Sequence, residues 1–185
     1  MMMKFFVIVS LVMFGVDAYS LTSRSTIKNC SVEKLQNFLA TPTNWPKIVA
    51  SSFGVEQADD SAPKKKQINS VDRPLRKGER VKEIFGLPPL VPLTVTWTCQ
   101  KNEVTQTNGN LEFFSPDGLE GVAKNCRMNF NIASDGNDSI LNLTVEVDPV
   151  SPLANLARPI LQLDNDFALN ALLPMGIKKS LKNSY

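Results

Sequence analysis

Apolar and polar residues alternate in three segments of the second half of the chain, residues 93–99, 126–132 and 141–147. A period of two is typical of a β-strand with one face buried and the other in water. Turn sequences lie between these segments: NG, SPDG and DGND. The pattern therefore predicts antiparallel strands that share one apolar face.

Three further segments are predicted to extend this sheet. They are residues 24–29 (RSTIKN), 79–85 (ERVKEIF) and 110–115 (NLEFFS). Between the second of these and residue 93 the chain reads GLPPLVP, an apolar stretch interrupted by three prolines. Because proline cannot donate to a β ladder, the sheet is expected to stop here. The stretch is predicted to be a stiff, apolar end of a hairpin.

Two short helices are predicted after the first strand. Ser31 precedes a run with apolar residues at helical spacing: Val32, Leu35, Phe38 and Leu39. A second helix is expected to start near Asn44, with Pro46 tolerated in its first turn and one apolar face: Trp45, Ile48 and Val49. Both helices are too short to be stable alone, so they must pack on the sheet.

A long helix is predicted near the C-terminal end. Ser151 and Pro152 form a favourable start, a cap followed by proline at the first helical position. Apolar residues then recur at intervals of three and four and set a broad face: Leu153, Leu156, Ile160, Phe167 and Ala171. Pro159 is expected to kink the helix or divide it in two, and Pro174 and Gly176 are expected to end it.

The order of elements is one strand, two short helices, a run of antiparallel strands and one long helix. A curved sheet wrapped around the C-terminal helix buries the apolar side of both. The predicted fold class is α+β, with about six to seven strands in a single domain over residues 22–183. The 185 residues suffice for one sizeable core and are too few to argue for two.

Composition and charge exclude several classes of function. The formal net charge is only +2, so no broad field for nucleic acid is expected. Histidine is absent, which removes the commonest general base and the commonest zinc ligand. The sequence shows no phosphate-binding glycine loop, paired-cysteine metal site or nucleophile elbow, so neither a metal nor a cofactor is expected. A lysine run lies in a polar segment that is either a solvated loop or a contact for an acidic partner or membrane surface: Lys64, Lys65 and Lys66.

Residues 1–18 have a positive start, an apolar run and small residues before Ala18. They are predicted to be a signal peptide cleaved after Ala18, because the run is shorter than the roughly 20 residues of a membrane span. The chain is therefore expected to enter the secretory pathway and to be secreted or kept in the endomembrane lumen. Asn137, in a polar turn, is the most accessible glycosylation candidate.

The cysteines and tryptophans each have two interpretations. Cys99 and Cys126 lie in phase with apolar strand faces, as small core residues do, and it stays open whether they or Cys30 form a disulfide. Trp45 and Trp97 could fill the core, which is the common role of large aromatic residues, or line a cavity.

Two carboxylates are the candidates for chemistry. Asp164 falls on the apolar face of the C-terminal helix, and Glu83 shares a strand face with Val81 and Phe85. A carboxylate in a pocket could orient a ligand hydroxyl or act as a general base. Asp164 could instead be structural and bond to backbone groups or Arg127. Nothing in the spacing shows that the two carboxylates meet.

Four phrases resemble the START-like or helix-grip superfamily, which includes the birch pollen allergen family and the polyketide cyclase and lipid transport proteins. The phrases are FLATPTNWPKIVASS (38–52), GERVKEIFGLPPLVPLTVTWTC (78–99), FFSPDGLEGVAKNCRMNF (113–130) and DPVSPLANLARPILQLDNDFALNALLP (148–174). The WP after a short helix is widespread in the superfamily. The proline-rich segment and the DN near the end look like a plastid-associated subgroup of plants and algae. The resemblance covers nearly all of the chain after residue 18.

The resemblance implies a hydrophobic cavity between sheet and C-terminal helix that holds a lipid, sterol, isoprenoid, pigment or polyketide. The protein is expected to be a monomer. It makes GLPPLVP either the rim of this cavity's mouth or only a tight cap on the sheet. The residues expected to bind the ligand lie on the inner faces of these elements: Trp45, Phe85, Leu87, Leu90, Val95, Trp97, Phe113, Met128, Phe130, Leu143, Val145, Ile160, Asp164 and Phe167.

Three functions remain open at this point. The first is a carrier whose affinity comes from buried apolar area. The second is an enzyme of the cyclase or dehydratase type that uses Asp164 or Glu83 as proton acceptor. The third is an interaction domain with a filled cavity. For localisation, Tyr19 after the signal resembles the two-part plastid address of algae with secondary plastids, whereas a fold that begins by Arg24 leaves little room for one.

Overall fold

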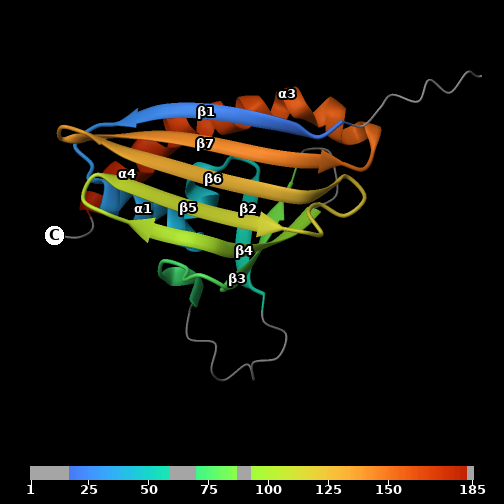
Figure 1. Ribbon diagram of the computed structural model, residues 1–185, viewed down its shortest axis with the longest axis horizontal. Coiled ribbons are helices and arrows are strands. Elements are labelled where there is room, and N and C mark those ends of the chain that lie inside the picture. Colours follow the sequence, from blue (N-terminus) through green and yellow to red (C-terminus); the bar gives the residue numbers. More distant parts are fainter. Residues whose placement is uncertain (1–16, 59–69, 87–92, 183–185) are drawn as a thin grey trace, which may run out of the picture.

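The computed structural model describes residues 17–58, 70–86 and 93–182, which form one antiparallel sheet and a set of helices (Figure 1). The strands are β1 (Tyr19–Ile27), β2 (Ser52–Gln57), β3 (Arg80–Phe85), β4 (Leu93–Val104), β5 (Asn108–Ser115), β6 (Ala123–Asp135) and β7 (Asp138–Pro149). The α-helices are α1 (Val32–Ala40), α2 (Trp45–Ile48), α3 (Pro152–Phe167) and α4 (Leu173–Lys182). The remaining helical turns are the 3-10 turns η1 (Pro42–Asn44) and η3 (Ser70–Asp72) and the π-helical turn η4 (Ala168–Leu172).

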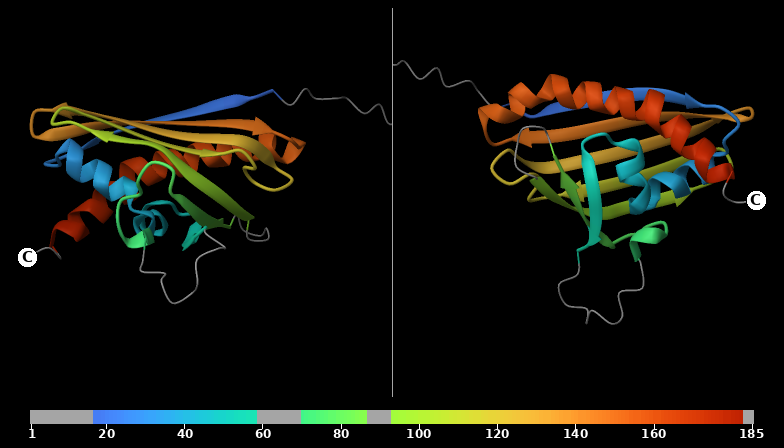
Figure 2. Two further views of the ribbon diagram at one scale, coloured as in Figure 1. Left: turned by 60° about the horizontal axis from the view of Figure 1, so that its bottom comes forward. Right: turned by 180° about the vertical axis from the view of Figure 1, so that it is seen from behind.

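The seven strands lie in the order β1-β7-β6-β5-β4-β3-β2, and every neighbouring pair is antiparallel. The sheet curves, and α1, α2 and the long C-terminal helix all lie against its inner face (Figure 2). A continuous apolar core fills the space between the two layers. The predicted α+β class and helix-grip arrangement are confirmed.

The alternating segments form strands whose buried face is the predicted one. On β4, Val95, Trp97 and Cys99 are at most 6% exposed, whereas Thr94, which directly precedes Val95, is exposed. Six apolar positions of β6 and β7 are likewise buried, at most 7% exposed: Cys126, Phe130, Ile132, Leu141, Leu143 and Val147. In β4, β6 and β7 the hydrophobic alternation therefore sets the inner face of the sheet.

Two strands differ from the prediction. β1 begins at Tyr19, earlier than Arg24, because its inward positions include the small polar residue Ser23, which weakens the apolar signal. β2 is absent from the prediction because its burial is reversed: Ser52 is buried and Phe53 is 64% exposed. β2 is an edge strand that pairs only with β3. An edge strand with a polar inward residue carries no hydrophobic alternation to detect.

The two short helices form where they are predicted. Ser31 caps α1, because its hydroxyl accepts a hydrogen bond from the backbone N–H of Lys34 at 3.4 Å. After η1, the indole N–H of Trp45 donates to the carbonyl oxygen of Leu39 at 2.8 Å. This bond ties the start of α2 to the end of α1 and holds Trp45 beneath the sheet.

The C-terminal helix is longer than predicted. α3 continues through Pro159 without dividing, and η4 joins it to α4. The predicted end at Pro174 and Gly176 is wrong, since α4 continues to Lys182. Pro174 lies in the first turn of α4, where a missing N–H is tolerated, and a Cβ atom on Gly176 would lie only 3.1 Å from Ile48. Gly176 therefore allows α4 to approach α2. No helix in the described part of the chain is long and apolar enough to span a membrane.

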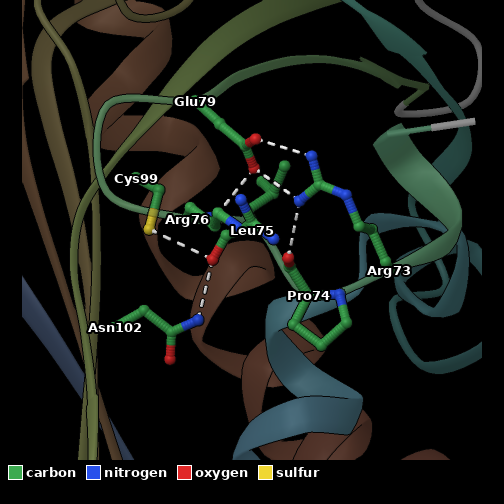
Figure 3. Close-up of polar contacts among 7 residues, drawn as sticks. All are labelled: Arg73, Pro74, Leu75, Arg76, Glu79, Cys99 and Asn102. Atoms are coloured by element: carbon green, nitrogen blue, oxygen red, sulfur yellow. Dashed lines mark hydrogen bonds and ion pairs between the residues drawn. The ribbon is translucent and has the colours of Figure 1, made fainter.

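A polar cluster fixes the segment between η3 and β3 (Figure 3). The guanidinium of Arg73 donates two hydrogen bonds to the carboxylate of Glu79, at 2.6 and 2.8 Å. The backbone N–H of Arg76 donates a third to the same carboxylate at 2.7 Å. The carbonyl oxygen of the buried Leu75 accepts from the side-chain amide of Asn102 at 2.7 Å. The cluster thus ties the entrance of β3 to β4.

Candidate functional site

A cavity of about 150 Å³ lies between the inner face of the sheet and α3. Its walls come from β1, α1, α2, β3, β4, β6, β7, α3 and η4, together with two connecting segments. Nearly all of its lining side chains are apolar, and those with an oxygen atom are Ser51, Glu83, Asp164 and Asn165. Because the walls come from both ends of the sequence, the cavity exists only in the complete fold.

Many of the residues predicted to bind a ligand line this cavity: Trp45, Phe85, Val95, Trp97, Met128, Phe130, Leu143, Val145 and Asp164. Strand alternation places those from the sheet on its inner face. Trp45 reaches the cavity because its bond to Leu39 holds the ring under the sheet. Both tryptophans are therefore core residues that also form part of the cavity wall.

Phe113 does not line the cavity, in contrast to the prediction. Its ring is fully buried on β5 and contacts two lining rings edge to face, Trp45 at 5.2 Å and Phe130 at 6.5 Å between ring centroids. α1 packs over β5, so this part of the inner face is filled. Phe113 supports the aromatic wall from behind, and such pairs contribute about 0.5–1.5 kcal/mol each beyond burial.

The predicted inward face of α3 is wrong in part. Ile160 and Phe167 point to solvent, and each residue is 53% exposed. The residues of this helix and η4 that do line the cavity are Leu161, Asp164, Asn165, Ala168 and Leu169. The helix carries apolar residues on both sides, so spacing alone does not select the buried one. The small, buried Ala154 and Ala168 mark the side that approaches the sheet.

Five predicted contact residues lie outside the described part of the chain: Leu87, Leu90, Lys64, Lys65 and Lys66. Their roles at the hairpin end and in the lysine-rich loop stay predictions. At the last described residue before the hairpin end, the backbone N–H of Gly86 donates to the carbonyl oxygen of Ser51 at 2.9 Å. The end of β3 is thus fastened beside a cavity-lining residue.

Sequence reasoning misses a second group of lining residues: Leu21, Leu39, Ile48, Val49, Ser51, Leu93, Leu119, Cys126, Val147, Leu161, Asn165, Ala168 and Leu169. Leu93, Cys126 and Val147 belong to alternating strands, so the alternation could have identified them. Ser51 and Leu119 lie in connecting segments and have no periodic signal.

Glu83 is the buried carboxyl group of the cavity wall. It is 2% exposed, and its Oε2 atom accepts a hydrogen bond from the indole N–H of Trp97 at 2.9 Å. Burial raises the pKa of Glu83 to about 7. The Ser52 hydroxyl and the Trp97 indole lower this pKa, and the charge of Asp164 raises it further. Ser52 lies near Glu83, but its hydroxyl has no partner of normal hydrogen-bond geometry among the described residues. Glu83 can therefore both give and take a proton near neutral pH.

Asp164 reaches the same cavity from α3. Its Oδ2 atom accepts a hydrogen bond from the hydroxyl of Ser51 at 2.6 Å, which fastens α3 to the segment before β2. Arg127 is not its partner, since it lies on the outer face of the sheet and pairs with Glu112. Because the charge of Asp164 acts on Glu83, the structure brings together the two carboxyl groups that spacing could not connect.

The three cysteines are buried and free: Cys30, Cys99 and Cys126. Cys126 lines the cavity, where burial raises the pKa of its thiol to about 11, so the thiol is neutral at pH values near 7. In residues 17–58, 70–86 and 93–182, no cluster of three or more His, Cys, Asp or Glu side chains could hold a metal ion. Asn137 is exposed in the turn between β6 and β7, and its glycosylation stays a prediction.

Comparison with known proteins bears on the fold. No protein-family model matches the sequence, and no curated protein matches it at a significant level. The chain is similar in structure to ginseng major latex-like protein 151 from Panax ginseng, with 12% identity and a TM-score of 0.55 over 82% of this chain and 95% of that one. A START superfamily protein from Mycobacterium smegmatis is similar with 9% identity and a TM-score of 0.57 over 90% of this chain and 99% of that one.

A third similar structure is the di-domain ARO/CYC protein BexL from the BE-7585A biosynthetic pathway. It has 14% identity and a TM-score of 0.59 over 86% of this chain and 46% of that one. Identities this low show a shared architecture and not a shared ligand, and they give no support to the plastid-associated subgroup. The chain has the helix-grip fold that is common to the START, latex-like and cyclase proteins.

Proposed function

We propose that the protein binds a small hydrophobic molecule in the cavity between the sheet and α3. The observation that carries the proposal is the cavity itself, which lies inside the core and is apolar on nearly all sides. The helix-grip fold is typical of proteins that bind hydrophobic molecules. Affinity would come from the apolar area removed from water, roughly 25 cal/mol per Å².

The volume of the cavity limits the size of the ligand. At about 150 Å³ it is smaller than the roughly 300–1,000 Å³ of most sites for drug-sized molecules. An engineered protein cavity of roughly this size admits benzene. The ligand that fits best is therefore one ring or a short branched chain with a small substituent, whereas a sterol would need α3 to move away from the sheet.

The first experiment is native mass spectrometry of the protein purified from its own source, followed by solvent extraction and identification of what is released. We expect a hydrophobic compound in stoichiometric amount. An empty protein that also takes up no member of a panel of small hydrophobic compounds would contradict the proposal. That result would favour an interaction domain whose interior serves only as a core.

A second candidate function is a cyclase-type or dehydratase-type reaction that uses Glu83 as the acid–base group. The raised pKa of Glu83 favours it, because a pKa of about 7 suits proton transfer at neutral pH. Asp164 would then orient a hydroxyl of the substrate. Turnover separates the two functions, since a carrier releases its ligand unchanged. Product formation that is lost in Glu83→Gln while binding is kept would favour the enzyme.

We also propose that residues 1–18 are removed on entry into the secretory pathway. In agreement with this, β1 begins at Tyr19, directly after the predicted cleavage site. N-terminal sequencing of the protein from its source tests the proposal, with Tyr19 as the expected first residue. A chain that keeps Met1 would contradict it, and a start well beyond Tyr19 would favour a two-part plastid address.

A further inference from the structure

Among the described residues, four side chains of the cavity wall carry an oxygen atom. We call this group the acidic pole, and it consists of Ser51, Glu83, Asp164 and Asn165. The hydroxyl of Ser51 donates to Asp164 at 2.6 Å, and the charge of Asp164 acts on Glu83. The other lining side chains are apolar or aromatic, apart from the thiol of Cys126. The described wall of the cavity thus combines a few polar groups with an apolar remainder.

In the part of the chain that the structure describes, neither carboxyl group of the acidic pole has a cation beside it. The lining residues include no lysine or arginine, and no ion pair among the described residues involves Glu83 or Asp164. Glu83 accepts from the Trp97 indole, and Asp164 accepts from the Ser51 hydroxyl. An ionised carboxylate has about four acceptor positions. Both groups therefore keep free acceptor capacity next to the empty space of the cavity.

We infer that the cavity selects small hydrophobic molecules whose polar end is a hydrogen-bond donor without negative charge, a hydroxyl or a protonated amine, and rejects carboxylates of the same size. This inference rests on the proposed binding function and names the chemical class of the ligand. The donor group lies against Glu83 and Asp164, and the apolar body of the ligand fills the space along Trp45 and Phe130.

The charge of the acidic pole explains the rejection of carboxylates. A bound carboxylate would bring a third acidic group next to two that have no counter-charge, and repulsion between charges is strong away from water. It would also leave the free acceptor positions of Glu83 and Asp164 without a donor. A hydroxyl fills one of these positions, and an ammonium group adds the attraction of a positive charge.

Of the described residues, three titratable groups face the cavity: Glu83 from β3, Asp164 from α3 and Cys126 from β6. Cys126 stays neutral because burial raises its pKa to about 11. Burial raises the pKa of Glu83 to about 7, so Glu83 gains negative charge as the pH rises from about 5.5 to about 8. A simple carboxylate ligand is ionised over this whole range. Its rejection therefore becomes stronger as the pH rises.

The test compares four probes of nearly equal size: ethylbenzene, phenethyl alcohol, phenethylamine and phenylacetate. Their dissociation constants are measured by NMR titration of the mature chain at about pH 8 and about pH 5.5. At the higher pH the alcohol and the amine are expected to bind at least about tenfold more tightly than phenylacetate. At the lower pH this ratio is expected to shrink severalfold. The ranking of alcohol and amine shows which donor the cavity prefers.

Two variants remove the charges without removing the shapes. Glu83→Gln keeps an acceptor for the Trp97 indole, and Asp164→Asn keeps an acceptor for the Ser51 hydroxyl. Each is expected to reduce the preference over phenylacetate severalfold, and Glu83→Gln is expected to abolish its pH dependence. The matched control is Glu79→Gln, which removes a carboxylate outside the cavity and is expected to leave the ratio unchanged. Amide NMR spectra of all three variants verify that they are folded.

The outcomes separate this inference from the binding function. If ethylbenzene binds but phenylacetate binds as tightly as the alcohol at about pH 8, the inference is overturned and the binding function stands. If the preference persists unchanged in both Glu83→Gln and Asp164→Asn, the acidic pole is not its cause, and the inference is again overturned. If none of the four probes binds, both proposals fail.

Discussion

Glu79 and Glu83 lie close together in the chain, yet their surroundings shift their pKa values in opposite directions. Glu79 accepts two hydrogen bonds from the guanidinium of Arg73 and one from the backbone of Arg76. The bonds from Arg73 are the largest cause of a pKa for Glu79 that lies below its usual value. Glu83 accepts one bond from the Trp97 indole, and burial raises its pKa to about 7.

The difference between the two glutamates is the set of partners that the chain supplies. Around Glu79 it supplies a guanidinium and a backbone donor, so the ionised form stabilises the start of β3 (Figure 3). Around Glu83 it supplies only neutral donors among the described residues, together with an apolar wall, so the ionised form destabilises the fold. This cost agrees with the proposed role of Glu83 in ligand binding. Four substitutions test the contrast.

The largest effect is expected from Val95→Asp. Val95 lies opposite Glu83 in the register of β3 and β4, so the change adds a second buried carboxylate beside that of Glu83. We expect a loss of about 3–5 kcal/mol or more in the free energy of unfolding, together with loss of ligand uptake. Urea unfolding and titration with ethylbenzene measure both, with Val95→Thr as the uncharged control of similar size. A folded Val95→Asp protein with full binding would count against the cavity as the site.

The next largest effect is expected from Glu83→Gln. Because the pKa of Glu83 is raised in the folded protein, its stabilising contribution is complete below the unfolded value of about 4.3 and is lost as the pH rises to about 7. The free energy of unfolding of the unaltered protein should fall by on the order of 3 kcal/mol across this window. Glu83→Gln should lack this slope and be the more stable protein at about pH 8. Equal slopes in urea unfolding series of the two proteins would show that Glu83 is not a desolvated acid.

A smaller effect of opposite sign is expected from Glu79→Gln. The lowered pKa of Glu79 means that its contribution is present above the unfolded value of about 4.3 and is lost as the pH falls through the folded value. Because Glu79 and Arg73 are 30% and 41% exposed, the cost at about pH 7 should be only about 0.5–1 kcal/mol. The same unfolding series measures it. A variant that is more stable than the unaltered protein at that pH would remove the contrast between the two glutamates.

The smallest effect is expected from Asp164→Asn. The charge of Asp164 raises the pKa of Glu83, and the asparagine can still accept from Ser51. The pKa of Glu83 should therefore fall by less than about one unit with little change in stability. The indole N–H resonance of Trp97 reports the ionisation of Glu83 in a pH titration, because the two groups are hydrogen-bonded. An unchanged titration midpoint would mean that the two carboxyl groups do not interact.

The sheet and short helices could be predicted from the sequence because their signals are local. Alternation places Val95 and Trp97 on the inner face, and Ser31 marks the start of α1. The side of α3 that faces the sheet could not be predicted, because both of its sides carry apolar residues. The close approach of small residues such as Ala168 decides the outcome, and this depends on the tertiary fold.

Individual residues of the candidate site could be predicted from the sequence, but their arrangement around one cavity could not. The strand face that Glu83 shares with Val81 predicts that the carboxyl group points inward. That both carboxyl groups of the acidic pole line one cavity depends on how α3 crosses the sheet, and no spacing in the sequence encodes this. Ser51 has no periodic signal, although it holds Asp164 in place.

The most direct test of the cavity as a binding site uses the two tryptophans of the chain. Trp45 and Trp97 both line the cavity, so an NMR spectrum of the labelled mature protein shows two indole N–H resonances that report its occupancy. We predict that titration with phenethyl alcohol shifts both resonances to saturation with one dissociation constant. The larger shift is expected for Trp97, which donates to Glu83 at the acidic pole. Two resonances that stay unmoved up to about ten millimolar ligand would contradict the central claim that this cavity binds small hydrophobic molecules.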